Sequence, residues 1–318
     1  MKSAVDPHHL LILSQHSEIY KQLIWLENLP DLSISAFRDP LQVIETGSKY
    51  DLVFAEPSLV CMILSHLANM KWLQSTWAGV EPLLKPSLRC DYILTNIRNV
   101  YGPLMSEYVV GYLLMIERQI LPRWQSQLQM EWDDRPYNTL RGKLFGLLGV
   151  GTIGATLAAT AKHFGMRVYG YTRESEACSD VDRYFHGGNI AEFAAELDFL
   201  VDCLPGTPAT RGMVDAPFLA QLPRRAWLVN IGRGSTIDET ALVNALSTGN
   251  LAGAVLDVFL EEPLPRGHPL WSTPNTFITS HTAARNNPAD IAQVFIDNYK
   301  RYIQGEPLLY KIDFKLGY

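Results

Sequence analysis

Leu147-Leu148-Gly149-Val150-Gly151-Thr152-Ile153-Gly154 is the stretch that decides the fold of this 318-residue chain. It places a GxGxxG spacing directly after an apolar run that predicts a strand and directly before an Ala-rich run that predicts a helix. Gly149 permits a tight turn, Gly151 lets a pyrophosphate approach the backbone, and Gly154 lets the helix pack on the strand. Because a helix N-terminus favours an anion, we predict that this turn, including Thr152 and Ile153, binds a dinucleotide. The alternative is an ordinary strand-to-helix turn that contains glycines by chance.

Six apolar runs, separated by amphipathic stretches, predict a doubly wound parallel sheet that includes the strand before the glycines. These runs are Leu144–Leu148, Arg167–Tyr171, Phe199–Cys203, Trp227–Ile231, Gly253–Val258 and Thr276–Thr279. Shorter runs near the N-terminus predict a second, smaller α/β unit. These runs are His9–Leu13, Ser33–Phe37, Leu52–Ala55, Lys71–Gln74 and Ile93–Thr95.

The length and the changes of pattern predict two domains. A chain of 318 residues exceeds the roughly 250 to 300 residues at which one core stops growing. A long helix predicted from Gly102 to Ile120 begins the second domain, and the polar stretch Arg123 to Thr139 predicts an arm or a long loop. A helix from Pro288 through Tyr302 would fold back on the first domain. We therefore expect a dinucleotide-binding domain of residues 101–285 and a substrate domain of residues 1–100 and 286–318.

Charge and composition argue against several classes of protein. The 27 Lys and Arg against 33 Asp and Glu leave a net charge of −6, which argues against nucleic-acid binding. No apolar run approaches the about 20 residues of a membrane span, and Leu10–Leu13 is too short for a signal-peptide core, so we expect a soluble, cytoplasmic protein. The four cysteines form no CxxC pair and no histidines match HExxH, so we expect neither a disulfide framework nor a metal site.

Polar residues follow three of the later predicted strands, at the sheet edge where ligands bind in open α/β folds. These segments are Asn230–Gly234, Leu256–Pro265 and Thr279–Ala284. Together with the glycine turn they resemble the D-isomer-specific 2-hydroxyacid dehydrogenases. The resemblance covers nearly the whole chain, because further matching segments are Leu204-Pro205, Ala241-Leu242 with Gly249, and His268–Trp271.

The resemblance implies a fold, an assembly and a set of contacts. The fold is a Rossmann-type dinucleotide-binding domain inserted in a flavodoxin-like substrate domain, both with doubly wound parallel sheets, and the assembly is a homodimer. The loop Trp77–Val80, the helix entry Tyr101–Glu107 and the lack of an acid after the second strand are most similar to bacterial glyoxylate/hydroxypyruvate reductases. By resemblance, the substrate loop is Trp77, Ala78, Gly79 and Val80, and the further cofactor contacts are Leu204, Pro205, Ile231, Gly232, Asp257 and Ala283. The alternative for the Trp77 loop is an ordinary turn with a core Trp.

Three side chains supply what the reduction of a 2-keto acid requires, namely a cation for the carboxylate, a donor for the ketone oxygen and a proton that accompanies the hydride. Arg233 offers a planar fork that holds the carboxylate and polarises the carbonyl. His281 can donate a proton near neutral pH, and Glu262 can orient it and stabilise the imidazolium. In the resembling family the matching positions have these roles, and Asp257 accepts a hydrogen bond from the nicotinamide amide.

Two details of this constellation depend on the resemblance. The following Pro263-Leu264-Pro265 distinguishes Glu262 from the adjacent Glu261. Ser280 stands where the family usually has Pro, which leaves the backbone before His281 less constrained. Taken singly, a strand-end His or an Arg between two glycines is more often structural, but their agreement with the glycine turn favours catalysis.

The end of the second predicted strand bears on the choice of cofactor. Thr172 and Arg173 occupy the place where an NAD-binding unit presents an Asp or Glu to the ribose hydroxyls. Arg173 could pair with the 2′-phosphate of NADP instead, so we expect NADPH as the preferred cofactor. The alternative is that Arg173 is a solvated surface cation and Glu174 reaches the ribose, which would restore NAD.

The leading hypothesis is an NADPH-linked reductase of a small 2-keto acid, glyoxylate or hydroxypyruvate, that forms the D-2-hydroxy acid. One alternative is an NAD-dependent dehydrogenase of a bulkier D-2-hydroxy acid. Another is a dinucleotide-sensing binding protein, because transcriptional corepressors resembling this family are built on the same fold. The acidic net charge argues against that last hypothesis.

Overall fold

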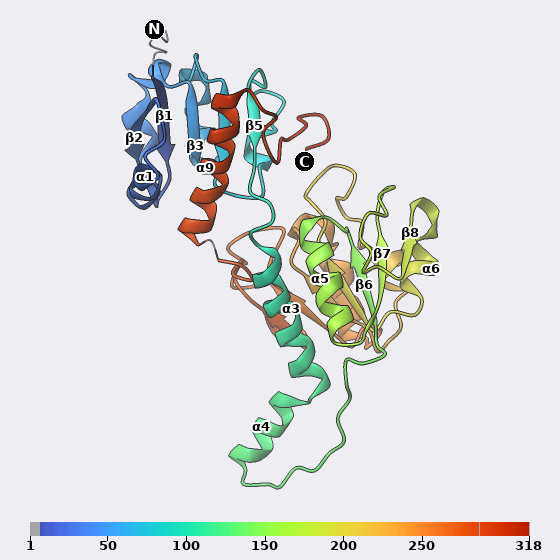
Figure 1. The fold of residues 1–318 in the computed structure, drawn as a ribbon. Helices are drawn as coiled ribbons and strands as arrows, with labels where there is room; N and C mark the ends of the chain where they lie inside the picture. Colours follow the sequence, from blue (N-terminus) through green and yellow to red (C-terminus); the bar gives the residue numbers. More distant parts are fainter. Residues whose placement is uncertain (1–6, 286, 318) are drawn as a thin grey trace. The chain divides into compact units, whose positions relative to one another are not determined.

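The computed structural model describes residues 7–285 and 287–317, and the chain divides into two compact units (Figure 1). Unit 1 comprises residues 1–100 and 286–318, and unit 2 comprises residues 101–285. Each unit contains one sheet in its described residues, of five strands in unit 1 and seven in unit 2, and all strand pairs are parallel. These sheets confirm the predicted fold class.

The sheet of unit 1 has the strand order β2-β1-β3-β4-β5, which is the flavodoxin-like order. Its strands are β1 (His8–Leu13), β2 (Leu32–Phe37), β3 (Leu52–Ala55), β4 (Trp72–Ser75) and β5 (Ile93–Thr95). The apolar runs of the sequence predict all five to within about two residues of their observed ends. Every residue of β3 is buried, as continuous apolar runs in a parallel sheet require.

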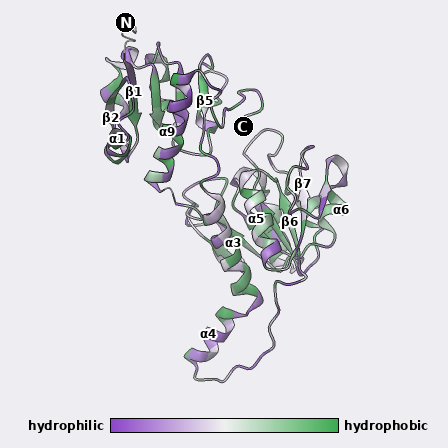
Figure 2. Cartoon of the chain, viewed as in Figure 1, coloured by the Kyte–Doolittle hydropathy of each residue, from purple (hydrophilic) through white to green (hydrophobic). Residues whose placement is uncertain are grey.

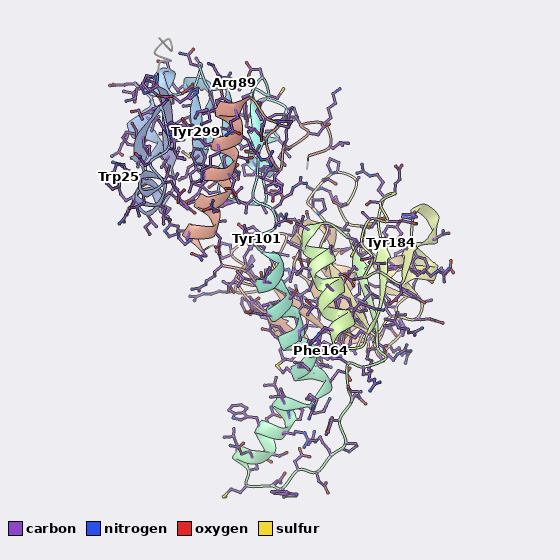
Figure 3. The ribbon with its side chains drawn as sticks, in the orientation of Figure 1. Trp25, Arg89, Tyr101, Phe164, Tyr184 and Tyr299 are labelled. Atoms are coloured by element: carbon purple, nitrogen blue, oxygen red, sulfur yellow. The ribbon has the colours of Figure 1, made fainter. Side chains whose placement is uncertain are left out.

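Helices cover both faces of this sheet, and one of them comes from the far end of the chain. They are α1 (Ser17–Leu26), α2 (Pro57–Val60) and α9 (Pro288–Gln304), which alternates between hydrophilic and hydrophobic residues (Figure 2). The Asn287 side chain accepts from the Ala289 amide at 3.2 Å and caps the start of α9, as predicted for a helix that begins at Pro288. Phe295 stacks on Trp72 of β4, and Tyr299 (Figure 3) donates to the Pro30 carbonyl at 2.6 Å, so α9 belongs to the core of unit 1.

The sheet of unit 2 has the strand order β12-β11-β10-β9-β6-β7-β8. Counted within the unit, this is the Rossmann order 3-2-1-4-5-6 with a seventh strand at the edge. The strands are β6 (Leu144–Leu148), β7 (Arg167–Tyr171), β8 (Arg183–Phe185), β9 (Phe199–Asp202), β10 (Trp227–Asn230), β11 (Gly253–Leu256) and β12 (Thr276–Ile278). Six of them are predicted from the sequence, and β8 is not, because Arg183-Tyr184-Phe185 begins with an exposed Arg and forms no apolar run.

The helices of unit 2 are α3 (Gly102–Glu117), α4 (Ile120–Leu128), α5 (Thr152–His163), α6 (Ile190–Ala194), α7 (Ala216–Leu219) and α8 (Glu239–Ser247). The single helix predicted over 102–120 is wrong at its end, because the left-handed backbone of Gln119 separates α3 from α4. The arm, residues 120–139, contains α4 rather than a loop alone. Trp124 and Trp132 of the arm are exposed.

No helix among residues 7–285 and 287–317 is long and apolar enough to cross a bilayer.

Candidate active site

The glycine turn joins β6 to α5 with the geometry that a phosphate needs. Gly149 has φ 89°, in the left-handed region, and its amide donates to the Tyr171 carbonyl at 2.9 Å. A Cβ at Gly154 would lie 2.4 Å from the Gly149 carbonyl oxygen, so the helix approaches the turn too closely for a side chain. A Cβ at Gly151 would meet no atom within 4 Å. The space beside Gly151 and the N-terminus of α5, which starts at Thr152, therefore fit an anionic group.

The other predicted cofactor contacts in unit 2 follow strands that neighbour β6. Leu204 and Pro205 follow β9, and Ile231 and Gly232 follow β10. The carboxyl ends of these parallel strands lie at one edge of the sheet, and the strand order reverses between β6 and β9. This switch point is where open α/β sheets bind ligands.

The end of β7 carries the residues that bear on cofactor choice. Arg173 and Glu174 are both exposed there. The Thr172 amide donates to the carbonyl of Phe185, the last residue of β8, at 3.1 Å. The hydrogen bond to Glu176 raises the pKa of His186, whose Nδ1 lies 3.2 Å from the Thr172 hydroxyl. This strand end therefore carries charged side chains of both signs.

Arg233 stands directly after β10, and its backbone is closely held. The side-chain Nδ2 of Asn230 donates to the Arg233 carbonyl at 3.2 Å. A Cβ at Gly234 would lie 1.9 Å from the carbonyl carbon of Phe259, so this loop runs against the loop after β11. The half-buried guanidinium donates to the Gly232 carbonyl at 2.8 Å. A planar fork on such a backbone suits two-point binding of a carboxylate.

Asp257, after β11, holds the loop after β12. Its Oδ1 accepts from the Thr282 amide at 2.8 Å and from the Thr279 hydroxyl, and its Oδ2 accepts from the Ala283 amide at 3.0 Å. Its carbonyl accepts from the His281 amide at 2.8 Å. The side chain is buried. In the structure Asp257 thus fixes the segment that carries His281, and its contact with a nicotinamide stays a prediction.

His281 adopts a left-handed backbone conformation with φ 54°, which costs of order 1–3 kcal/mol in a non-glycine residue. The hydrogen bonds that Asp257 accepts on both sides of this position hold the conformation. The sequence suggests a loose backbone here because Ser280 replaces a Pro. The structure instead assigns the restraint to Asp257.

The imidazole of His281 is paired with one carboxylate. Its Nδ1 lies 2.8 Å from Oε2 of Glu262, and Oε1 of Glu262 accepts from the Phe259 amide at 3.0 Å. Glu262, and not the adjacent Glu261, makes this pair in the structure. Among residues 7–285 and 287–317, Nε2 of His281 has no hydrogen-bond partner, and the side chain is half-exposed. A proton on Nε2 is therefore accessible to a ligand.

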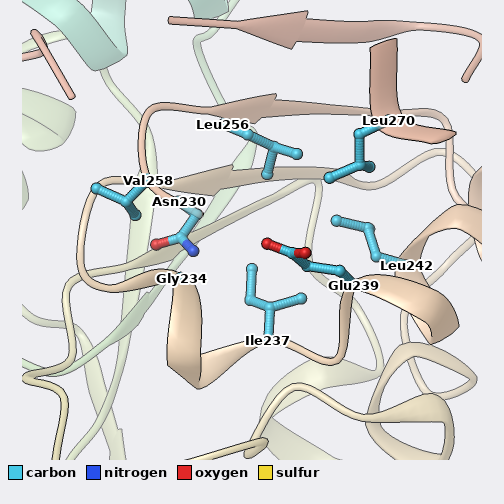
Figure 4. A pocket seen from close by; sticks show the side chains of 8 residues that line it. All are labelled: Asn230, Gly234, Ile237, Glu239, Leu242, Leu256, Val258 and Leu270. Carbon is cyan, nitrogen blue, oxygen red and sulfur yellow. The ribbon is translucent and has the colours of Figure 1, made fainter. Parts of the chain in front are cut away.

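Glu239, on the first turn of α8, holds the loop that carries Glu262, a role the sequence does not predict. Its Oε1 accepts from the Leu260 amide at 2.8 Å, and its Oε2 lies 3.2 Å from Nε2 of His268. Its carboxylate points into a small pocket (Figure 4). The sequence offers only the ordinary preference for acidic residues at a helix start. The pocket is lined by Asn230, Gly234, Ile237, Glu239, Leu242, Leu256, Val258 and Leu270.

The predicted substrate loop of unit 1 follows β4. The Ser75 hydroxyl accepts from the Trp77 amide at 2.9 Å, and the Asn96 side chain donates to the Ala78 carbonyl at 2.7 Å. Within the described residues, the amides of Ala78, Gly79 and Val80 have no hydrogen-bond acceptor. These N–H groups are donors that an anionic ligand can use.

The side chains of the described residues include no group of three His, Cys, Asp or Glu that could hold a metal ion. The residues that fit a bound group are instead those of the glycine turn, which suit the pyrophosphate of a dinucleotide.

Comparison with known proteins agrees with this geometry. Residues 110–283 match the family model for the NAD binding domain of D-isomer specific 2-hydroxyacid dehydrogenases. The chain is 31% identical over 300 residues to glyoxylate/hydroxypyruvate reductase A from Photorhabdus laumondii subsp. laumondii, covering 92% of this chain and 94% of the relative.

Solved structures show the same likeness over both units. A D-isomer specific 2-hydroxyacid dehydrogenase family protein from Aeromonas salmonicida is 40% identical, with a TM-score of 0.90, and 96% of this chain and 99% of that chain are covered. An NADPH-dependent glyoxylate/hydroxypyruvate reductase from Sinorhizobium meliloti, in complex with NADP and sulfate, is 26% identical with a TM-score of 0.86, covering 98% and 100%. A D-isomer specific 2-hydroxyacid dehydrogenase from Xanthobacter autotrophicus, in complex with NADPH and MES, is 29% identical with a TM-score of 0.87, covering 98% and 100%.

Proposed function

Since the chain belongs to the D-isomer specific 2-hydroxyacid dehydrogenase family and is an NAD(P)-dependent oxidoreductase, we propose that it reduces glyoxylate or hydroxypyruvate with NADPH. The product is the D-2-hydroxy acid. The observation that carries the proposal is the 2.8 Å pair of His281 and Glu262, at the sheet edge that also carries Arg233. A glycine turn that fits a pyrophosphate lies at that same edge.

His281 is the proton donor. Glu262 accepts from Nδ1, so Nε2 carries a proton only in the imidazolium form, and that proton goes to the ketone oxygen. When bound, the nicotinamide supplies the hydride, which forms the new C–H bond at the keto carbon. Loss of the proton leaves a neutral imidazole that Glu262 keeps oriented for the next turnover.

Arg233 holds the substrate. Its guanidinium grips the carboxylate of the 2-keto acid at two points and polarises the adjacent ketone. Unit 1 is the substrate domain in this proposal, because the amides of Ala78 and Gly79 offer further donors to a carboxylate. Unit 2 is the dinucleotide-binding domain.

NADPH is the proposed cofactor because Arg173 is exposed at the end of β7 and no acid stands at Thr172. The relatives from Sinorhizobium meliloti and Xanthobacter autotrophicus, which are bound to NADP and NADPH, support this choice. NAD remains the cofactor of the alternative in which Glu174 binds the ribose.

The proposed assembly is a homodimer in the cytoplasm, with α3 and the arm at its two-fold interface. The arm supports this proposal because it exposes Trp124, Met130 and Trp132, and exposed aromatic and Met side chains are typical of protein interfaces.

Initial rates over a panel of 2-keto acids, with NADH and NADPH in parallel, test the function. We expect turnover of glyoxylate and hydroxypyruvate, faster with NADPH. A preference for NADH and a bulkier keto acid would support the alternative dehydrogenase. Dinucleotide binding without turnover of any keto acid would instead support a dinucleotide-sensing protein.

A further inference from the structure

Asp202, the last residue of β9, is a fully buried carboxylate behind the Arg233 loop. Its Oδ1 accepts from the Leu204 amide at 2.9 Å, and its Oδ2 forms a short hydrogen bond with the hydroxyl of Thr236. Thr236 is also fully buried. A carboxylate held, within the described residues, only by one amide and one hydroxyl, with no contact to solvent, is unusual, because burying a charge costs free energy.

Thr236 connects this carboxylate to Arg233. Its Oγ1 lies 2.6 Å from the Arg233 carbonyl oxygen, which also accepts from the side-chain amide of Asn230 at 3.2 Å. A hydroxyl carries a single hydrogen, so Thr236 donates fully either to Asp202 or to the Arg233 carbonyl, and not to both. Which acceptor receives the hydrogen depends on whether Asp202 carries a proton.

We propose that Asp202 is a positioning residue, whose protonation turns the Thr236 hydroxyl toward the Arg233 carbonyl and so tightens the loop that holds Arg233. The inference rests on the proposed function in one respect, namely that Arg233 binds the carboxylate of the keto acid.

Two arrangements of hydrogens follow from the geometry. When Asp202 is ionised, Thr236 donates to Oδ2, and the Arg233 carbonyl keeps the bonds from the Asn230 side chain and from the Thr236 backbone amide, both at 3.2 Å. When Asp202 takes up one proton from solvent, its Oδ2–H donates to Thr236 Oγ1, and the hydroxyl donates to the Arg233 carbonyl. The second arrangement is a continuous chain of two hydrogen bonds that point toward Arg233, and such chains polarise one another.

The surroundings of Asp202 favour a change of its protonation state close to neutral pH. Burial raises the pKa of Asp202 from its ordinary 3.8 to about 6, while the hydrogen bonds from Thr236 and Leu204 lower it. Leu148 on β6 and Asn230 on β10 lie opposite it in the sheet register. Burial raises the pKa of the Cys203 thiol well above its ordinary value, so this neighbour adds no charge near neutral pH.

The Arg233 carbonyl can be observed directly. The chain contains four Arg-Gly pairs, Arg141-Gly142, Arg211-Gly212, Arg233-Gly234 and Arg266-Gly267. Labelling Arg with carbonyl ¹³C and Gly with ¹⁵N therefore leaves four carbonyl resonances in a triple-resonance spectrum of the full-length, deuterated protein. Arg233→Lys identifies the resonance of Arg233, because that variant lacks it.

We expect the Arg233 carbonyl resonance to move between pH 5 and pH 8 with a midpoint near pH 6. In Asp202→Asn the side-chain amide donates to Thr236 as a protonated Asp202 would, so the resonance should stay at its low-pH position throughout. Thr236→Ser keeps the hydroxyl and should titrate like the wild type, whereas Thr236→Val should show no movement of this origin. A wild-type resonance that stays still, or a movement that persists in Asp202→Asn, would overturn the proposal.

Steady-state kinetics give the functional readout. At pH 8 the KM for glyoxylate should be roughly two- to tenfold lower in Asp202→Asn than in the wild type, which is the effect expected of one added hydrogen bond. At pH 5 the wild type and Asp202→Asn should have the same KM, and Thr236→Val should have a higher KM than Asp202→Asn at both pH values. A higher KM for Asp202→Asn at pH 8 would overturn the proposal. If no variant reduces any keto acid, the proposed function fails, but the carbonyl titration still decides whether the hydroxyl turns.

Discussion

Replacing Asp202 by Asn should remove a loss of folding free energy that the wild type undergoes as the pH rises. The folded-state pKa of about 6 lies above the ordinary value of 3.8, so between these values the folded protein keeps a proton that the unfolded chain has released. The contribution of Asp202 to the free energy of unfolding is therefore fully present below pH 3.8 and is lost as the pH rises through 6. At about 1.4 kcal/mol for each pH unit of difference, the total loss is roughly 3 kcal/mol.

Asp202→Asn has no titrating group at this position, so its free energy of unfolding does not undergo this loss. Relative to the wild type, its free energy of unfolding should rise by about 2 kcal/mol between pH 4.5 and pH 8, because part of the roughly 3 kcal/mol is already lost at pH 4.5. Urea unfolding at several pH values, followed through the transition of unit 2, measures this difference. Asp134→Asn is the matched control, because it removes the same charge from an exposed site in the same unit. A difference between wild type and Asp202→Asn that stays constant with pH would refute the reasoning.

Three further predictions concern the proposed function. His281→Ala should lower kcat for keto-acid reduction by about 10²- to 10⁴-fold while dinucleotide binding survives. Glu262→Gln should lower kcat less, because it keeps the hydrogen bond that orients His281. Near-normal turnover in His281→Ala would exclude His281 as the proton donor. Arg173→Ala should raise the KM for NADPH and leave that for NADH nearly unchanged, so equal effects on both cofactors would contradict the assignment. Sedimentation at micromolar concentration should show a dimer, and a species of 35.7 kDa alone would contradict the proposed interface of α3 and the arm.

The two sheets and the glycine turn are predictable from the sequence because their signals are local. A strand of a parallel sheet that is covered on both faces needs a continuous apolar run, and Leu144–Leu148 shows one. The spacing from Gly149 to Gly154 describes a turn that closes within a few residues, so the turn does not depend on the rest of the chain. Signals of this kind fail for β8, which begins with the exposed Arg183 and forms no apolar run, and for α4, whose hydrophobic and hydrophilic residues both face solvent (Figure 2).

The sequence by itself also determines which residue types follow the strands, and so the chemistry to expect of Arg233, Glu262 and His281. Only the tertiary structure decides which polar groups meet. Asp202 and Thr236 are 34 residues apart, and Glu239 and Leu260 are 21 apart. Such contacts depend on the order and register of parallel strands, which bring distant loops to one edge of a sheet. The raised pKa of Asp202 has the same origin, because the sheet that surrounds this carboxyl removes it from water.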